Sequence, residues 1–149
     1  MNWTIKKFDE LTLHELYAIL QLRNEVFIIE QNCIYPDLDD KDQAAWHLLC
    51  FNNDELIAYT RLLPPGVSYD DPAIGRVVTA ATARRSGLGK ELMLRSIDAC
   101  EKLFGKIPIS LGAQVYLKHF YESLGFSAAG DMYLEDGIEH IKMTRIASK

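Results

Sequence analysis

The residues with the clearest chemical character lie between positions 84 and 90, where the chain reads Arg-Arg-Ser-Gly-Leu-Gly-Lys. They follow a short apolar segment and open a long amphipathic pattern typical of a helix. The first turn of a helix carries unpaired backbone N–H groups and the positive end of the helix dipole. Gly87 and Gly89 allow a ligand to approach that backbone, and Arg84, Arg85 and Lys90 add positive charge. This stretch predicts a binding site for a phosphate-bearing ligand.

The spacing of these residues excludes two common phosphate-binding loops. A Walker A loop needs a glycine where this chain has Arg84, and Ser or Thr where it has Glu91. A Rossmann fingerprint needs a third glycine where this chain has Leu92. A plainer interpretation also stays open, in which the arginines are solvated at the start of an ordinary helix.

Two segments together indicate a family. Arg84-x-x-Gly87-x-Gly89 resembles the signature with which the GCN5-related N-acetyltransferase (GNAT) superfamily binds the pyrophosphate of acetyl-CoA, and residues 120–126 resemble a second segment of that superfamily. A finer resemblance is to the small bacterial ElaA-type branch, through residues 26–31, Cys33, Tyr35, Asp39, Asp42, His47, 75–77 and 136–143. The chain departs from the superfamily at Ala80-Ala81, where a small residue and proline are frequent, and at Gln114, where asparagine is frequent.

Apolar periodicity predicts the elements that position these residues. Strands are expected near residues 3–8, 46–51, 55–63, 75–79, 107–113, 126–133 and 138–145, and helices near 13–29, 88–104 and 117–124. The order β-α-β-β-β-α-β-α-β-β predicts an α/β fold in which a mixed sheet carries helices on both faces. This is also the order of the GNAT fold, and the resemblance implies that the fourth and fifth strands splay apart.

The same resemblance implies where acetyl-CoA binds. Its pantetheine arm would lie between the splayed strands, along the backbone of Val77, Val78 and Thr79, with an N–H of Val78 or a neighbour donating to the thioester oxygen. The residues expected to contact the cofactor are Val77, Val78, Thr79, Arg84, Arg85, Ser86, Gly87, Leu88, Gly89, Lys90, Gln114, Leu117, Phe120 and Tyr121.

Transfer of an acetyl group to an amine needs an acid for the leaving thiolate and a base for the ammonium. Tyr121 stands where the superfamily often carries the acid, although it could instead only pack beside Phe120. Glu30, His47 and His140 are the candidate bases, and the sequence does not choose among them. No metal is expected.

An acidic run, comprising Asp37, Asp39, Asp40 and Asp42, follows the first predicted helix. It does not fit an EF-hand, because Lys41 and Asp42 occupy positions that need an oxygen ligand and glycine. The run could attract a cationic amine, or it could be a solvated loop.

Composition narrows the classes of function. The 149 residues are 48% hydrophobic and 25% charged, which predicts one globular domain spanning residues 1–149. The net charge of −5 argues against nucleic-acid binding, and no segment has the pattern of a signal peptide or a membrane span. Three cysteines without paired spacing favour a reducing cytoplasm. An apolar strand edge near the C-terminus would face either solvent or a second copy in a homodimer.

Two functions of different classes follow. The first is an N-acetyltransferase that moves an acetyl group from acetyl-CoA to a primary amine of a small molecule or peptide. The second is a non-catalytic module that binds acyl-CoA as a sensor. Transfer of longer acyl chains, or to a hydroxyl, also stays open within the first class.

Overall fold

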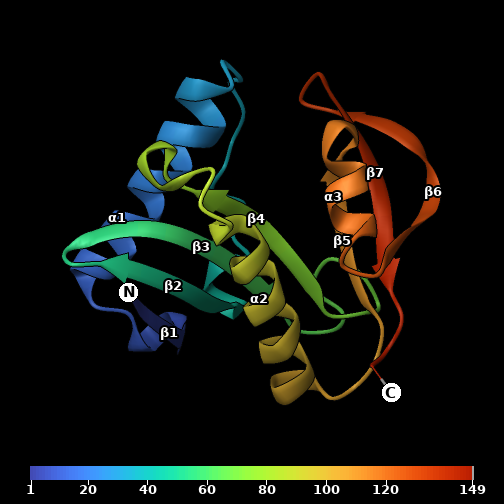
Figure 1. Cartoon of the computed structure of the whole chain (residues 1–149), viewed down its shortest axis with the longest axis horizontal. Helices are drawn as coiled ribbons and strands as arrows, with labels where there is room; N and C mark the ends of the chain where they lie inside the picture. The colour runs from blue at the N-terminus through green and yellow to red at the C-terminus, as the bar shows by residue number, and fades with distance from the viewer. Residues whose placement is uncertain (149) are drawn as a thin grey trace.

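A computed structural model of the chain, which describes residues 1–148, contains one seven-stranded sheet with the order β1-β2-β3-β4-β5-β7-β6 (Figure 1). The strands are β1 Asn2–Lys7, β2 Trp46–Asn52, β3 Glu55–Leu63, β4 Ala73–Thr79, β5 Ile109–Gln114, β6 Phe126–Glu135 and β7 Ile138–Arg145. The α-helices are α1 Leu13–Arg23, α2 Leu88–Phe104 and α3 Lys118–Glu122. Short 3-10 turns cover Phe8–Glu10, Asp42–Ala44, Ala81–Ala83 and Val115–Leu117. The predicted order of strands and helices is confirmed.

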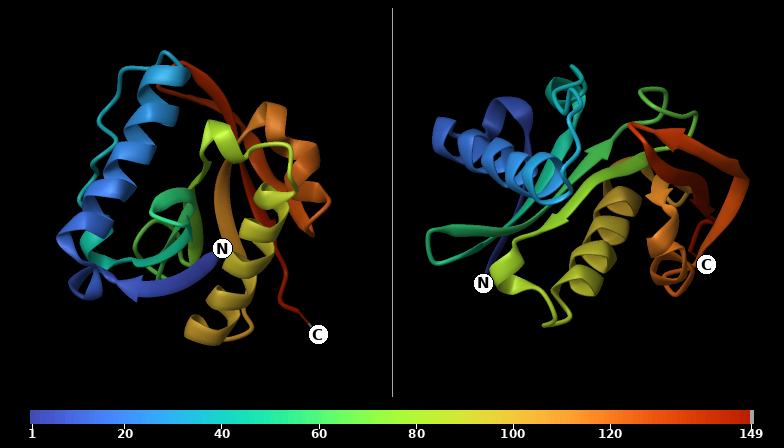
Figure 2. Two further views of the ribbon diagram at one scale, coloured as in Figure 1. Left: turned by 60° about the vertical axis from the view of Figure 1, so that its left-hand side comes forward. Right: turned by 90° about the horizontal axis from the view of Figure 1, so that it is seen from above.

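The helices cover both faces of the sheet, with α1 on one face and α2 and α3 on the other (Figure 2). Ile19 and Leu22 of α1 are buried with the apolar residues of β2 and β3. On the other side, Met93 and Ile97 of α2 belong to a buried cluster that includes Leu111 of β5. Burial of these apolar faces supplies most of the driving force that holds helices and sheet together. None of the described helices is long and apolar enough to cross a membrane.

The strands β4 and β5 are parallel neighbours that diverge almost from their start (Figure 1). Their register within the described chain consists of one pair, Ala73 with Ser110, supported by a 3.0 Å hydrogen bond from Ser110 N to Pro72 O. After this point β4 follows β3, and β5 follows β7. The predicted splay is therefore confirmed, and it leaves the facing edges of both strands without a strand partner.

The divergence coincides with an irregularity in β4. Arg76 has a φ of +50°, and the register between β3 and β4 shifts between Tyr59 and Arg61. Such a bulge bends a strand and increases its twist. Because the bend lies on the β4 side of the opening, it turns the rest of β4 away from β5.

The first helix differs from its prediction. It begins as expected at a capping box, in which Thr12 Oγ1 accepts from Glu15 N at 3.0 Å and Glu15 Oε1 accepts from Thr12 N at 2.8 Å. It is α-helical only to Arg23 and continues as a π-helix over Asn24–Glu30. Apolar spacing over seven residues does not distinguish these two helical pitches, so the sequence predicted one continuous helix.

Candidate active site

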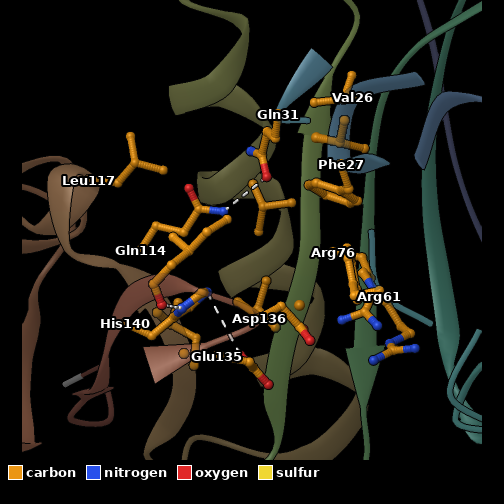
Figure 3. Close-up of a pocket in the computed structure, with 18 of the residues that line it drawn as sticks. Val26, Phe27, Gln31, Arg61, Arg76, Gln114, Leu117, Glu135, Asp136 and His140 are labelled. Atoms are coloured by element: carbon orange, nitrogen blue, oxygen red, sulfur yellow. Dashed lines mark hydrogen bonds and ion pairs between the residues drawn. The ribbon is translucent and has the colours of Figure 1, made fainter. Parts of the chain in front are cut away.

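A cavity of about 800 Å³ occupies the opening between β4 and β5. Its walls come from five parts of the chain: the π-helix, the loop that follows it, β3 with β4, β5 with α3, and the β6–β7 hairpin. Figure 3 shows residues of the π-helix, of β3 and β4, of β5 and of the β6–β7 hairpin around one space. The tertiary structure thus gathers side chains that are distant in the sequence around the splay.

The β4 wall includes Val77, Val78 and Thr79, as predicted for the cofactor-binding strand. On one edge these residues lie beside β3, where Val78 is in register with Tyr59 and Thr79 with Ala58. The other edge faces the opening and pairs with no strand within residues 1–148. Backbone N–H and C=O groups on that edge are available to a ligand that runs along it as an added strand would.

The β5 wall carries Gln114, Leu117 and Tyr121, which all line the cavity. Gln114 Nε2 donates to Gln31 Oε1 at 3.4 Å, which links β5 to the end of the π-helix across the opening (Figure 3). Phe120 does not line the cavity, since it packs edge-on against Tyr121 with ring centroids 5.2 Å apart. Its contact with the cofactor stays a prediction, and the structure shows its packing contact with Tyr121.

The predicted phosphate-binding stretch forms the start of α2. Gly87 is the N-cap with a φ of +79°, a conformation that favours glycine. The first backbone bond of the helix runs from Glu91 N to Gly87 O at 3.2 Å, so the N–H groups ahead of Glu91 lack helical partners. Arg84 lines the main cavity, whereas Arg85, Gly87, Gly89 and Lys90 flank it beyond its boundary.

Ser86 and Leu88 of that stretch line a second, smaller cavity of about 360 Å³. The Leu88 side chain is buried in the core. Only its backbone is therefore placed to meet a phosphate, which narrows the predicted role of this residue.

Tyr121 is buried, and its ring lies edge-on to both Phe120 and Phe126. Burial raises the pKa of Tyr121 to about 12. The phenol therefore keeps its proton at neutral pH, so a proton is available for a developing thiolate, although the raised pKa makes the phenol a weaker acid than an exposed tyrosine. Its place in the cavity wall, opposite β4, is compatible with the predicted acid role.

His140 of β7 lines the same cavity, with a side chain only 12% exposed. Its Nδ1 lies 2.8 Å from the carbonyl oxygen of Ile138. Because a carbonyl only accepts, Nδ1 must carry the hydrogen, which leaves the lone pair of the neutral ring on Nε2. Glu135 Oε2 lies 3.7 Å from Nε2, and Tyr133 stacks on the ring at 5.8 Å. His140 thus has the tautomer that a general base requires.

His47 does not belong to this site. It is fully buried, its Nδ1 lies 2.6 Å from the hydroxyl of Tyr59, and its Nε2 lies 2.9 Å from the backbone oxygen of Asp42. Burial lowers the pKa of His47, so the ring stays neutral with both nitrogens occupied. The hypothesis that His47 is the general base is therefore corrected: it is a structural residue behind β3.

Glu30 lines the cavity at the end of the π-helix, but its carboxylate is engaged. Glu30 Oε2 lies 2.7 Å from Arg84 Nη1, and Arg84 Nη2 also donates to the backbone oxygen of Thr79 at 3.3 Å. The candidate base and the candidate phosphate ligand are thus paired with each other. In this arrangement Glu30 is less available than His140 to take a proton from an amine.

The acidic run does not form the solvated or amine-attracting loop that was expected. Asp37 binds Arg23 and Arg76, with contacts of 2.8 Å and 2.7 Å. Asp42 accepts from Arg23 at 2.8 Å and from Arg61 at 3.0 Å. We call the set Arg23, Asp37, Asp39, Asp42, Arg61 and Arg76 the Arg–Asp network.

Charge compensation in the Arg–Asp network is strong. Asp39 is held by Arg61 through two contacts, Oδ1 with Nη1 at 2.7 Å and Oδ2 with Nη2 at 2.8 Å. Although burial alone would raise it, these hydrogen bonds hold the pKa of Asp39 well below its usual range. The sequence did not identify these three arginines as partners of the aspartates. The one local signal is Arg76, the single charged residue of the otherwise uncharged strand β4.

No group of three or more His, Cys, Asp or Glu side chains placed to hold a metal ion occurs in residues 1–148. Cys33 is buried, and its Sγ lies 3.4 Å from the backbone oxygen of Asp136.

Comparisons with known proteins agree with this architecture. The acetyltransferase (GNAT) domain family matches residues 15–147. Protein ElaA of Escherichia coli K12 is 40% identical over 147 residues, which cover 97% of this chain and 96% of that protein. A crystal structure of an acyl-CoA N-acyltransferase from Pseudomonas aeruginosa is 45% identical with a TM-score of 0.92, covering 97% of this chain and 99% of the other. The crystal structure of Escherichia coli ElaA has a TM-score of 0.90, covering 97% and 98%.

Proposed function

Because this chain belongs to the GNAT acetyltransferase family, we propose that it transfers an acetyl group from acetyl-CoA to a primary amine of a small molecule or peptide. The observation that carries this proposal is the shared cavity. One space in the splay is lined by the unpaired edge of β4, the protonated phenol of Tyr121 and the ring of His140. An acyl-CoA-dependent transfer needs a binding site for the thioester, an acid and a base, and we assign these roles to the β4 edge, Tyr121 and His140 respectively.

Acetyl-CoA would enter between β4 and β5 with its pyrophosphate at the start of α2. Backbone N–H groups at Gly87 to Lys90, together with Arg84 and Arg85, would bind the phosphate oxygens. The β4 edge would pair with the pantetheine amides, and a β4 N–H near Val78 would donate to the thioester carbonyl oxygen. Much of the rate would come from holding thioester and amine in one geometry.

The transfer itself needs an ordered set of proton movements. His140 Nε2 takes one proton from the ammonium of the acceptor, directly or through water, and later releases it to solvent. The free amine attacks the thioester carbon, so that a C–N bond forms and the C–S bond breaks. Tyr121 gives its proton to the departing thiolate, and the phenolate recovers a proton from the attacking nitrogen, directly or through water, which leaves the neutral amide. Glu30 is assigned to Arg84 instead of to this step, since the two form an ion pair.

The first experiment measures the binding of acetyl-CoA, CoA and ATP by thermal shift, on wild type and on Gly89→Glu. A Cβ added at Gly89 would meet no atom within 4 Å, so the backbone has room for a side chain there and the variant introduces a negative charge at the predicted phosphate-binding site. Stabilisation by both CoA forms, absent with ATP and lost in the variant, is expected. No shift with either CoA form would contradict the proposed cofactor.

The second experiment follows CoA thiol release with a panel of amines, in wild type, His140→Gln and Tyr121→Phe. Each variant is expected to lose about 10²-fold or more in kcat, the usual contribution of a general acid or base, while CoA still binds. Binding of CoA without transfer to any amine would instead favour the acyl-CoA sensor. Release with acyl-CoAs of longer chain would report on acyl preference in the same assay.

A further inference from the structure

One wall of the cavity is positively charged. It lies near Arg76 in the middle of β4, away from the end of β4 where Thr79 and Arg84 lie. Lys41, Arg61 and Arg76 line it together with Asp39. The three arginines and three aspartates of the Arg–Asp network compensate one another, whereas Lys41 Nζ makes no ion pair within the described residues and contacts only Ser68 Oγ, at 2.8 Å. This wall therefore keeps an excess positive charge in an acidic protein.

Both arginines of this wall have unused donors. Arg76 donates from Nε to the carboxylate of Asp37, and from Nη2 to the backbone oxygen of Asp37 and the carboxylate of Asp39. Its Nη1 donates to no group among residues 1–148. The Arg76 side chain is 21% exposed and lines the cavity. Arg61 is almost completely buried, and its Nε is inaccessible and has no hydrogen-bond partner in the described structure. Arg61 therefore adds positive charge to this wall, and Arg76 is the arginine placed to donate directly to a ligand.

The aspartates hold these donors in place. The bidentate contact of Asp39 with Arg61 and the contacts of Asp37 with Arg76 fix two guanidinium planes before any ligand arrives. Arg76 also lies over the ring of Tyr35, 5.9 Å from its centroid. A fixed guanidinium fork is suited to a carboxylate, whose two oxygens match its geometry, and little side-chain entropy is lost on binding.

The wall across the cavity has the opposite character. His140, Glu135 and Asp136 belong to the β6–β7 hairpin, and Figure 3 shows them across from the guanidinium groups of Arg61 and Arg76. Glu135 is the carboxylate beside His140 Nε2. An ammonium group would be attracted to this wall, beside the nitrogen that is placed to take its proton.

From these two walls, we propose that the acceptor is a free amino acid whose carboxylate binds Arg76, supported by Lys41 and Arg61, while its amine faces His140. This inference rests on the proposed transferase function and adds the substrate class. It replaces the expectation of a purely cationic amine attracted by the acidic run, because arginines pair with three of the four aspartates, Asp37, Asp39 and Asp42, and only Asp40 is left exposed.

The test on the substrate side needs no variant. CoA thiol release from acetyl-CoA is measured with the common L-amino acids and with the α-carboxamide of each. The pairs differ at the carboxylate, so any preference reports on its recognition. For at least one amino acid, kcat/KM is expected to exceed that of its carboxamide by about tenfold or more, as loss of a charged contact implies. Equal or better use of the carboxamides throughout would overturn the inference.

The test on the protein side uses Arg76→Gln and Lys41→Met, with Arg95→Gln as the matched control on the outer face of α2. Both cavity variants are expected to raise KM for the amino acid and to reduce the preference over the carboxamide, while KM for acetyl-CoA stays within about twofold. Arg95→Gln should change neither. Lys41→Met keeps the test decisive if Arg76→Gln, which removes contacts to Asp37 and Asp39, fails to fold.

Failure of this inference and failure of the proposed function give different results. Efficient transfer to amines with no dependence on a carboxylate would overturn the inference and leave the transferase function in place. If no amine is acetylated, binding is measured instead, by thermal shift of the CoA-loaded protein with the same amino acids and their α-carboxamides. Stabilisation by acids alone, lost in Lys41→Met, would still support the carboxylate site, and its absence would overturn it.

Discussion

The guanidinium of Arg84 lies 2.7 Å from the carboxylate of Glu30, and this ion pair connects the end of the π-helix to the loop that leads into α2. The two side chains are 36% and 44% exposed, and 54 positions separate them in the chain. The pair lies at the mouth of the cavity, where an incoming pyrophosphate would compete with Glu30 for Arg84. From this relationship we propose that Glu30 acts in cofactor entry instead of proton transfer.

Replacement of Glu30 by glutamine tests that assignment. Since an exposed pair contributes at most about 1 kcal/mol, Glu30→Gln should tighten CoA binding by about two- to fivefold and change kcat little. Titration of CoA by calorimetry and steady-state kinetics measure the two effects. Asp98→Asn, which breaks the exposed pair with Lys102 on α2, serves as the control. A hundredfold loss of kcat with unchanged CoA affinity would instead identify Glu30 as the base.

The raised pKa of Tyr121 makes a prediction about alkaline pH. Because burial raises it to about 12, the phenol should stay protonated, and able to donate, up to about pH 11. Loss of kcat between pH 8 and 10 is therefore not expected from this group. Tyr121→Phe should lower kcat by about 10²-fold across that range without changing the shape of the pH profile. A wild-type profile that falls above pH 9 and becomes flat in Tyr121→Phe would contradict this interpretation.

The buried His47 should make the fold sensitive to mild acid. Its pKa is lowered by burial, so below about pH 6.5 the unfolded chain takes up a proton that the native state does not. The free energy of unfolding should therefore fall as pH decreases from about 7.5 to 5.5. Urea unfolding at these two values measures the loss, and His47→Gln should show a smaller one. That variant should also lose about 1–3 kcal/mol at pH 7.5, because two buried hydrogen bonds are disrupted.

Gly112 keeps room for a tyrosine in the cavity. A Cβ added at this β5 position would lie 2.8 Å from the hydroxyl oxygen of Tyr133, whose ring stacks on His140. Gly112→Ala should displace Tyr133 and lower kcat/KM for the acceptor several-fold, with KM for acetyl-CoA little changed. Adding Tyr133→Phe removes the contacting oxygen and should restore most of the loss. An unchanged acceptor kcat/KM in Gly112→Ala would show that this contact is relieved without cost.

Local signals in the sequence were sufficient for the order of the strands and helices, and they also carry the prediction of a phosphate-binding site at the start of α2. The capping box at Thr12, the apolar stripe of α2 and the alternation in β7 depend on residues a few positions apart. Such patterns can be recognised without knowledge of the tertiary contacts. The glycines and arginines that begin α2 are local in the same sense. The GNAT fold, its splay and the membership of Tyr121 and His140 in one cavity all followed from patterns of this kind or from the resemblance they carry.

The tertiary structure alone decided which charged groups meet. Asp37 and Asp42 were expected to face solvent or a cationic amine, yet they are bound by arginines 14 to 39 positions away. His47 was a candidate base on a strand, and only the packing of β2 against β3 shows its ring closed off by Tyr59. The reason is physical: burial and ion pairing depend on which faces of distant elements meet. The spacing of residues along the chain does not determine the spatial distance between such side chains.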